Sequence, residues 1–233
     1  MFKLALAAGH YLYTSGRRCD KTLDPKETRE WVLNDRIADK IEAILDGYDG
    51  IEVLRLDDTT GRTCPSNRQR TDAANEWDAD FYLSIHHNAG ADRSNAGGIT
   101  AHVYTKASKE SIEWQKELYK ATVDATGLVG NRANPLVKNN LHEVRETKMP
   151  AVLMECGFMD SKKDVPVILT EAFADQMAKA IADVIVKRSG ATKKAKTFYR
   201  VQVGAYEKKS NATLMLNQLK AAGFDGFIVT VTE

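Results

Sequence analysis

Short apolar stretches alternate with amphipathic segments along most of the chain. Apolar runs with the length of buried strands cover residues 2–8, 51–56, 80–86, 99–104 and 149–156. Between them, apolar residues recur at helical spacing over 27–45, 66–77, 109–126 and 172–186. Strands that alternate with helices predict an α/β fold, with a twisted, mostly parallel or mixed sheet and helices on both faces.

The pattern changes after the last of these helices. Residues 187–197 are basic and have no hydrophobic period, so we expect a linker there. Beyond it, the pattern predicts a small strand–helix–strand unit, with strands at 198–205 and 227–231 and a helix at 210–222. The expected organisation is therefore a large domain over 1–186, a linker over 187–197, and a small C-terminal β-α-β unit over 198–233. Segments 11–26 and 128–140 are predicted to be loops.

Composition and charge narrow the class of protein. Hydrophobic residues make up 43% and charged residues 28% of the chain, which excludes intrinsic disorder as its main state. No apolar run approaches the ~18 residues of a membrane span. The net charge of +1 divides into +6 from Lys187 onward and −5 before it. A basic tail indicates contact with an anionic or polymeric surface, although a solvated linker would carry the same charges. Without a recognition motif, nucleic acid is not expected as the partner.

The N-terminus and the cysteines indicate where the protein is made. The first apolar run stops at Gly9-His10 without a small-residue cleavage site, so it favours a buried strand over an export signal. We expect a protein made in the cytoplasm without a signal peptide. Cys19, Cys64 and Cys156 form no C-x-x-C pair, so the sequence supports neither a cysteine zinc site nor a redox motif.

Two histidines lie at the carboxyl ends of predicted strands. His10 follows the first strand, and His86 ends the strand 80–86. Ligands bind at this edge of open α/β sheets, so the two side chains are candidates to converge. His87 should point to the opposite face of the strand from His86, which makes it a supporting or structural residue.

A carboxylate would complete a metal-binding set. Two histidines and one glutamate are a common ligand set for catalytic zinc. Glu27, Glu30 and Asn34 share one face of the helix predicted at 27–45, so spacing does not choose between the glutamates. The alternative is that all these residues are ordinary polar residues at strand and helix ends.

Glu155 interrupts the apolar run 149–156. Burying a carboxylate is costly unless it is paired or has a function. Desolvation would raise its pKa, as a general acid and base at neutral pH requires. A buried salt bridge, for instance with Arg145, is the alternative.

Several segments together resemble the zinc-dependent N-acetylmuramoyl-L-alanine amidases, a cell-wall family that includes phage endolysins and bacterial autolysins. In family order they are Ala8-Gly9-His10, Glu30-Trp-Val-Leu-Asn34, 70–75, Ala79 to Asn88 with its S-I-H-H-N end, Gly98-Ile99, and Pro150 to Phe158 (P-A-V-L-M-E-C-G-F). The resemblance implies that His10, Glu30 and His86 bind Zn²⁺ and that Glu155 is the catalytic carboxylate. Further candidates for substrate contact or support are Asn34, Asn88, His102 and Arg145.

The chain departs from the family pattern at three places. The family usually opens with D-P-G-H-G-G, where this chain has Ala-Ala-Gly-His-Tyr. Thr100 follows Gly98-Ile99, where a glutamate is frequent, so a polar contact is expected to differ. Cys156 occupies a variable apolar position, and we expect it to pack in the core.

The tail resembles the SPOR fold, a wall-binding module that recognises glycan strands stripped of their peptides. The resemblance rests on the segments Y-R-V-Q-V-G-A-Y at 199–206 and G-F-I-V at 226–229. A complete SPOR domain has two strand–helix–strand repeats, and this tail has room for one. A unit of this size rarely folds alone, so we expect it to pair with a second chain in a homodimer or to dock on the catalytic domain.

The expected function is that of a peptidoglycan hydrolase. The resemblance implies a zinc-dependent enzyme that cleaves the amide bond between N-acetylmuramic acid and the L-alanine of the stem peptide. The lack of an export signal favours a phage endolysin that reaches the wall at host lysis. The alternatives are another zinc peptidoglycan hydrolase, such as a peptidase or deacetylase, and a wall-binding protein without catalytic activity.

Overall fold

The computed structural model describes residues 1–195 and 201–231, which fall into two units that divide between Lys194 and Ala195. Part of the strand predicted at 198–205 therefore lies outside the described residues. Among the helices in the described ranges, none is both long and apolar enough to cross a membrane.

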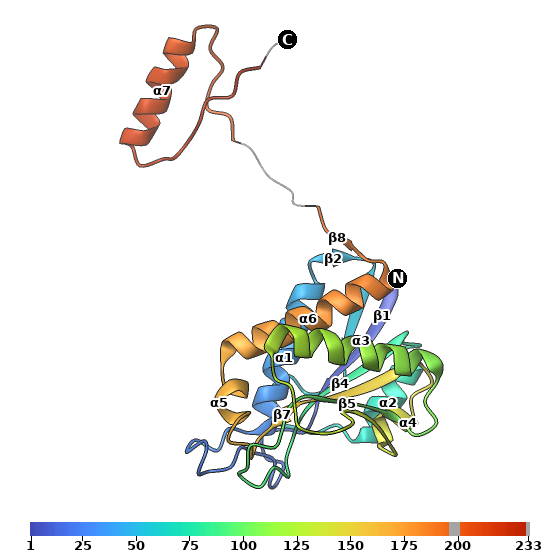
Figure 1. Ribbon diagram of the computed structural model, residues 1–233. Coiled ribbons are helices and arrows are strands. Elements are labelled where there is room, and N and C mark those ends of the chain that lie inside the picture. Colours follow the sequence, from blue (N-terminus) through green and yellow to red (C-terminus); the bar gives the residue numbers. More distant parts are fainter. Residues whose placement is uncertain (196–200, 232–233) are drawn as a thin grey trace. The chain divides into compact units, whose positions relative to one another are not determined.

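A six-stranded sheet forms the centre of the first unit (Figure 1). In spatial order, its strands are β3 (Ile51–Arg55), β1 (Phe2–Ala8), β4 (Phe81–Asn88), β7 (Ala151–Phe158), β5 (Thr100–Tyr104) and β6 (Leu136–Asn139). Neighbouring strands are parallel except β5 and β7, which are antiparallel. The mixed, mostly parallel sheet confirms the predicted fold class. The central strands β1, β4 and β7 are apolar along most of their length because helices cover both of their faces.

Helices pack on both faces of this sheet. The larger core lies under α1 (Glu30–Leu45), α3 (Lys109–Thr126) and α6 (Glu171–Ser189), and α6 also packs against both α1 and α3. Trp114 of α3 stacks on Phe81 of β4, with ring centroids 3.9 Å apart. A smaller core on the opposite face is covered by α2 (Asn67–Glu76) and the short α4 (His142–Arg145). The one-turn helix α5 (Val165–Ile168) follows β7.

The start of α1 differs from the prediction by three residues. The helix begins at Glu30, and Glu27 lies before it with a φ of 49°. The Glu27 carboxylate instead accepts from Arg18 Nε at 3.0 Å. This choice between two glutamates matters, because only Glu30 enters the helix and faces the sheet edge.

Residues 128–140 are not entirely a loop, as β6 ends this segment and α4 follows it. Strand β6 lies at the edge of the sheet and pairs with β5. The buried amide of Gln115 donates to backbone oxygens of both strands, Ala101 at 2.7 Å and Val137 at 3.0 Å. A four-residue strand and a four-residue helix are too short to show a period in sequence.

The predicted linker begins within ordered structure. Helix α6 continues to Ser189 because basic side chains favour a helix C-terminus. Arg188 also lies over the Trp114 ring at 4.2 Å and pairs with Glu117 at 2.9 Å. Thr192–Lys193 then form β8, which pairs antiparallel with β2 (Tyr48–Asp49).

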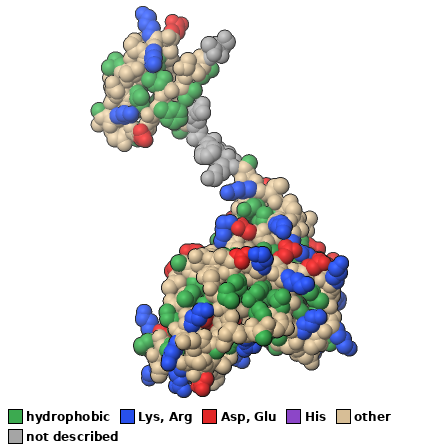
Figure 2. Space-filling model, viewed as in Figure 1, with side chains coloured by type: hydrophobic (Ala, Val, Ile, Leu, Met, Phe, Trp, Pro, Cys, Tyr) green, Lys and Arg blue, Asp and Glu red, His purple; other side chains and the backbone are tan. Residues whose placement is uncertain are grey.

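The second unit contains the helix α7 (Lys209–Ala221), close to the predicted 210–222. The predicted flanking strands do not form in the described residues, since 201–206 and 224–231 carry no strand. A strand requires a hydrogen-bonded neighbour, and two or three short segments seldom supply a stable sheet. No residue of α7 is buried. Figure 2 shows hydrophobic side chains exposed on this unit; those of the flanking segments include Val201, Val203, Phe224, Phe227, Val229 and Val231.

Candidate metal centre and active site

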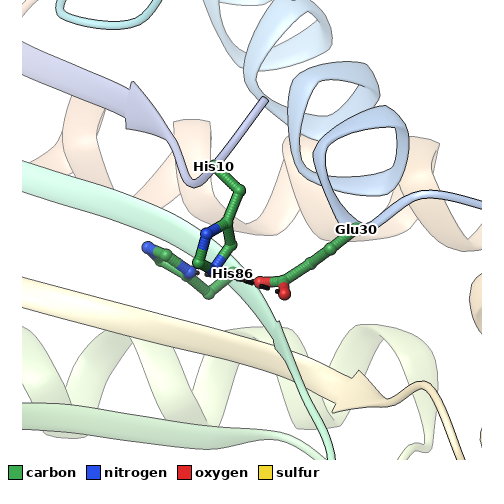
Figure 3. A group of neighbouring side chains, drawn as sticks. All are labelled: His10, Glu30 and His86. Atoms are coloured by element: carbon green, nitrogen blue, oxygen red, sulfur yellow. Dashed lines mark hydrogen bonds and ion pairs between the residues drawn. The ribbon is translucent and has the colours of Figure 1, made fainter. Parts of the chain in front are cut away.

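His10, Glu30 and His86 converge at the carboxyl edge of the sheet (Figure 3). One ligand atom from each lies within 4.8 Å of the others. His10 Nε2 is 3.4 Å from Glu30 Oε2, and His86 Nδ1 is 3.2 Å from Glu30 Oε1. The two rings meet edge to face, with centroids 5.0 Å apart. The structure therefore brings together the three residues predicted as metal ligands.

The backbone around Gly9 and His10 is shaped to bring the two rings together. A Cβ atom on Gly9 would overlap the His86 ring, so only glycine allows this approach. His10 itself has a φ of 66°, a left-handed conformation that residues other than glycine rarely adopt. Ala8 N–H donates to Asp57 Oδ1 at 2.9 Å and fixes the end of β1. Strained backbone held in this way is typical of functional sites.

Glu30 is the first residue of α1 and is fully buried. Its Oε1 accepts from the backbone N–H of His87 at 3.2 Å. Its Oε2 makes no hydrogen bond within the described part of the chain, although Arg17 Nη1 faces it at 3.9 Å. A buried carboxylate oxygen that faces a histidine and lacks a donor is a suitable metal ligand.

Asn34, one turn further along α1, and His87 of β4 support this arrangement. Asn34 Nδ2 donates to the Gly9 carbonyl at 3.0 Å, and its Oδ1 lies 2.7 Å from His87 Nδ1. His87 thus packs toward α1, as expected for a supporting residue, while His86 enters the cluster. Asn34 ties together the loop after β1, the start of α1 and the end of β4.

The charges of the cluster suit a dication. Burial lowers the pKa of His10 to about 4, so its imidazole is neutral and can donate a lone pair. Burial opposes ionisation of Glu30, but contacts with His86 and His10 lower its pKa below the usual value. Burial by itself would lower the pKa of His86. The contacts with Glu143 and Glu30 outweigh this effect and raise the pKa to about 10. Zinc would displace that proton, because it binds the neutral imidazole. Two imidazoles and the Glu30 carboxylate, whose Oε2 accepts no hydrogen bond within the described residues, fit Zn²⁺.

Glu155 lies on β7 beside His86 of β4 in the strand register. Its Oε2 is buried, and no hydrogen-bond partner for it exists among residues 1–195 and 201–231. Burial raises the pKa of Glu155 to about 7, partly offset by His86. The alternative of a salt bridge with Arg145 is wrong, because Arg145 contacts Asn140 and Glu146 instead. Glu155 is therefore a free carboxyl group poised to exchange protons near neutral pH.

The remaining predicted residues lie outside this cluster. His102 of β5 is held between Thr100 Oγ1 at 2.9 Å and Asn139 Nδ2 at 3.0 Å. Asn88 accepts from the N–H of the next residue at 2.9 Å and so shapes the turn after β4. Cys156 is buried in the larger core, as predicted.

Sequence reasoning missed Glu143, a buried residue of α4. Its Oε1 accepts from Tyr82 at 2.7 Å and Ser84 at 3.2 Å, and its Oε2 lies 3.5 Å from His86 Nε2. The available signal was the alternation of polar or hydroxyl-bearing residues Tyr82, Ser84 and His86 in an otherwise apolar strand. They share one face of β4 and require a polar partner there.

An α/β sheet with a His–Glu–His cluster that could hold a metal ion, and a free buried carboxyl group beside it at the carboxyl edge, is an arrangement suited to a hydrolase. The sequence profile of the N-acetylmuramoyl-L-alanine amidase family matches residues 4–187. The chain belongs to this family of cell-wall amidases.

Two curated relatives agree with this assignment. N-acetylmuramoyl-L-alanine amidase CwlM of Bacillus licheniformis is 30% identical over 98% of this chain and 85% of its own length. The sporulation-specific N-acetylmuramoyl-L-alanine amidase of Bacillus subtilis (strain 168) is also 30% identical, over 86% of this chain and 76% of its own.

Solved structures show the same fold. The catalytic domain of the amidase CwlV from Bacillus (Paenibacillus) polymyxa var. colistinus aligns with a TM-score of 0.70 and 27% identity, over 81% of this chain and 98% of that one. An N-acetylmuramoyl-L-alanine amidase from Clostridium difficile 630 aligns with a TM-score of 0.71 and 28% identity, over 80% and 95%.

The SPOR domain profile matches residues 169–230. The match begins before α6, a helix that packs in the first unit against α1 and α3. It also includes α7 and the apolar segments on either side of it. The chain therefore combines an amidase domain with a wall-binding SPOR domain, and it acts on peptidoglycan.

Proposed function

We propose that the chain is a zinc-dependent amidase that cleaves the bond between N-acetylmuramic acid and L-alanine, with Zn²⁺ held by His10, Glu30 and His86. The observation that carries the proposal is the Glu30 carboxylate. It is buried between two histidine rings, and its Oε2 accepts no hydrogen bond from the described residues. Such an arrangement is costly without a cation. Other zinc hydrolases use similar ligands, but the family match favours the amidase over a peptidase or deacetylase.

When bound, zinc supplies a Lewis acid that polarises the amide carbonyl and makes a water molecule more acidic. Glu155 takes a proton from the attacking water, which its pKa of about 7 in this buried position allows. After the tetrahedral intermediate forms, Glu155 returns this proton to the departing L-alanine amine. Asn34 keeps the Gly9 carbonyl and Glu30 in place throughout.

Metal analysis tests the proposal directly. We expect about one zinc per chain in the purified protein, and loss of wall hydrolysis on chelation that zinc restores. His10→Ala and Glu30→Gln should lose both metal and activity, whereas Glu27→Gln, a matched glutamate three residues away and outside the cluster, should keep both. Hydrolysis that survives complete removal of metal would contradict zinc dependence.

The same proposal includes a role for the tail. Removal of the stem peptide leaves denuded glycan, and the SPOR domain would hold the enzyme where cleavage has begun. The exposed apolar residues around α7 support the further idea that two chains pair their tails in a homodimer. Sedimentation of the full chain should show a dimer, and a chain ending at Lys194 should be monomeric. A monomeric full chain at high concentration would favour docking on the amidase domain or solitary binding instead.

The lytic role in a phage stays a prediction. The two curated relatives named above come from Bacillus species. A wall amidase of either origin would use the same site, so the origin changes none of the residue assignments.

A further inference from the structure

A second buried carboxylate faces the nitrogen of His86 that points away from Glu30. We propose that Glu143 is a positioning residue: it accepts a hydrogen bond from His86 Nε2–H and so makes Nδ1 the nitrogen that binds the metal. The proposal rests on the zinc site proposed above. It adds a residue from α4 that neither the sequence nor the family match assigns.

The two ring nitrogens of His86 have different surroundings. Nδ1 lies 3.2 Å from Glu30 Oε1, whose other oxygen lies 3.4 Å from His10 Nε2. Nε2 is buried and makes no hydrogen bond within the described residues, and Glu143 Oε2 faces it at 3.5 Å. A neutral imidazole carries one N–H, so an acceptor at Nε2 leaves the lone pair on Nδ1. Metal-binding histidines usually donate their other N–H to such a group.

Strand β4 presents three polar side chains to this one carboxylate. Tyr82, Ser84 and His86 alternate along the strand and therefore share a face. Both hydroxyls donate to Oε1, at 2.7 Å and 3.2 Å, and Oε2 remains for His86. The two hydroxyl donors fix the rotamer of Glu143, and the free oxygen is directed at the ring.

Arg70 of α2 links Glu143 to the other histidine. Its Nη1 is 3.8 Å from Glu143 Oε1, and its Nη2 donates to the His10 carbonyl at 3.4 Å. Arg70 is buried, so it offsets the cost of burying the Glu143 charge. One network thus supports the His86 ring and the backbone of His10.

The short segment that carries Glu143 is anchored to α2. His142 Nε2 lies 3.3 Å from Thr71 Oγ1. Asn75 Nδ2 donates to the Glu146 carbonyl at 2.8 Å, and Asn75 Oδ1 accepts from Lys148 N–H at 2.8 Å. A four-residue helix held at both ends can position a carboxylate rigidly, which a positioning role requires.

Zinc affinity is the first test, measured on the full chain by competition with a chromogenic chelator. Loss of a carboxylate that supports a metal-binding histidine typically weakens metal binding about 10–100-fold. We expect Glu143→Gln to weaken zinc binding about 10-fold and Glu143→Ala more, toward 100-fold. Glu146→Gln should leave zinc affinity unchanged, because it keeps the backbone carbonyl that Asn75 holds and changes only a side chain that contacts Arg145. Tyr82→Phe removes a donor to Glu143 without touching His86, so it should lower thermal stability more than zinc affinity.

Imidazole ¹⁵N spectra of the zinc-loaded wild type give a second test that requires no variant. We expect His86 protonated at Nε2 and metal-bound at Nδ1; the reverse would overturn the proposal. If the wild type binds zinc and Glu143→Gln binds it equally well, the role of Glu143 is refuted and the zinc site stands. If the wild type binds no zinc, the zinc site itself falls, and this role with it.

Discussion

The two units of the chain bury their apolar residues to very different extents. The first has two cores around a six-stranded sheet, with side chains such as Trp114 and Phe81 almost fully buried. Among residues 201–231, the second has one helix with no buried residue and exposed apolar side chains on both flanking segments. Because burial of apolar surface is the main stabilising contribution to folding, the first unit has the means to fold by itself, and the described residues of the second bury too little apolar surface to do so.

This difference in burial suits the two units to different roles, the first to the chemical reaction and the second to attachment. Catalysis needs groups held in fixed positions, and the sheet edge provides that for the proposed site residues His10, Glu30, His86 and Glu155. A surface that is apolar and unpaired gains its order by binding, either to a wall polymer or to another copy. Changes made separately in the two units should therefore affect different properties, and removal of the proposed catalytic carboxylate, that of Glu155, should have the largest effect.

Removal of the Glu155 carboxylate should abolish the chemistry of the first unit and leave attachment intact. Glu155→Gln should lower kcat about 10²–10⁴-fold, the usual contribution of general acid–base catalysis. Zinc content and wall binding should be unchanged, which metal analysis and a pull-down with purified walls would show. Activity close to wild type would remove Glu155 from the mechanism.

Matched substitutions in the two units should differ greatly in their effect on stability. Trp114→Ala removes the ring between Phe81 and Arg188 and should lower the free energy of unfolding by about 3–5 kcal/mol. Leu214→Ala, at an exposed position of α7, should change it by less than about 0.5 kcal/mol. Denaturant unfolding followed by circular dichroism measures both. A large loss for Leu214→Ala would mean that α7 is buried in solution.

The pH dependence of activity should follow the Glu155 carboxylate. Burial raises its pKa from 4.5 to about 7, and a bound dication would shift it back toward the lower value. Since Glu155 must be ionised to take a proton, kcat/KM should fall as pH falls between these limits, approaching tenfold per pH unit. The raised pKa also means that, in the metal-free protein, this group lowers stability as pH rises from 4.5 to about 7. An acidic limb unchanged in Glu155→Asp would assign it to another group.

Removal of the second unit should have the smallest effect on chemistry. A chain ending at Lys194 should retain its thermal stability and its activity on soluble muropeptides, because its cores are complete. It should be retained less on walls, most clearly on walls stripped of stem peptides. Both chains should carry Glu155→Gln in this comparison, so that neither hydrolyses the walls during the binding assay. Equal retention of both chains would contradict wall attachment by the tail.

The sequence predicted those site residues that lie at the ends of strands with a clear hydrophobic pattern. His10 and His86 follow from the ends of the strands 2–8 and 80–86, which meet at one edge of the sheet. To choose Glu30 over Glu27 from the residues alone, one must know where α1 begins, and helix periodicity does not define that residue. The polar face of β4 indicated that a polar partner was needed, but it did not identify Glu143, because the four-residue helix of Glu143 has no period and its partners lie about 60 residues away. The prediction of strands in the tail was wrong in the described residues for a related reason. A strand forms only beside a hydrogen-bonded neighbour, and a local sequence pattern does not show whether one is present.

The most direct test of the central claim is mass spectrometry of purified peptidoglycan digested by the full chain, with and without a zinc chelator. The account predicts free stem peptides that begin with L-alanine and intact glycan, lost on chelation, restored by zinc and absent with Glu155→Gln. Peptides cut internally, or the same products after complete removal of metal, would contradict it.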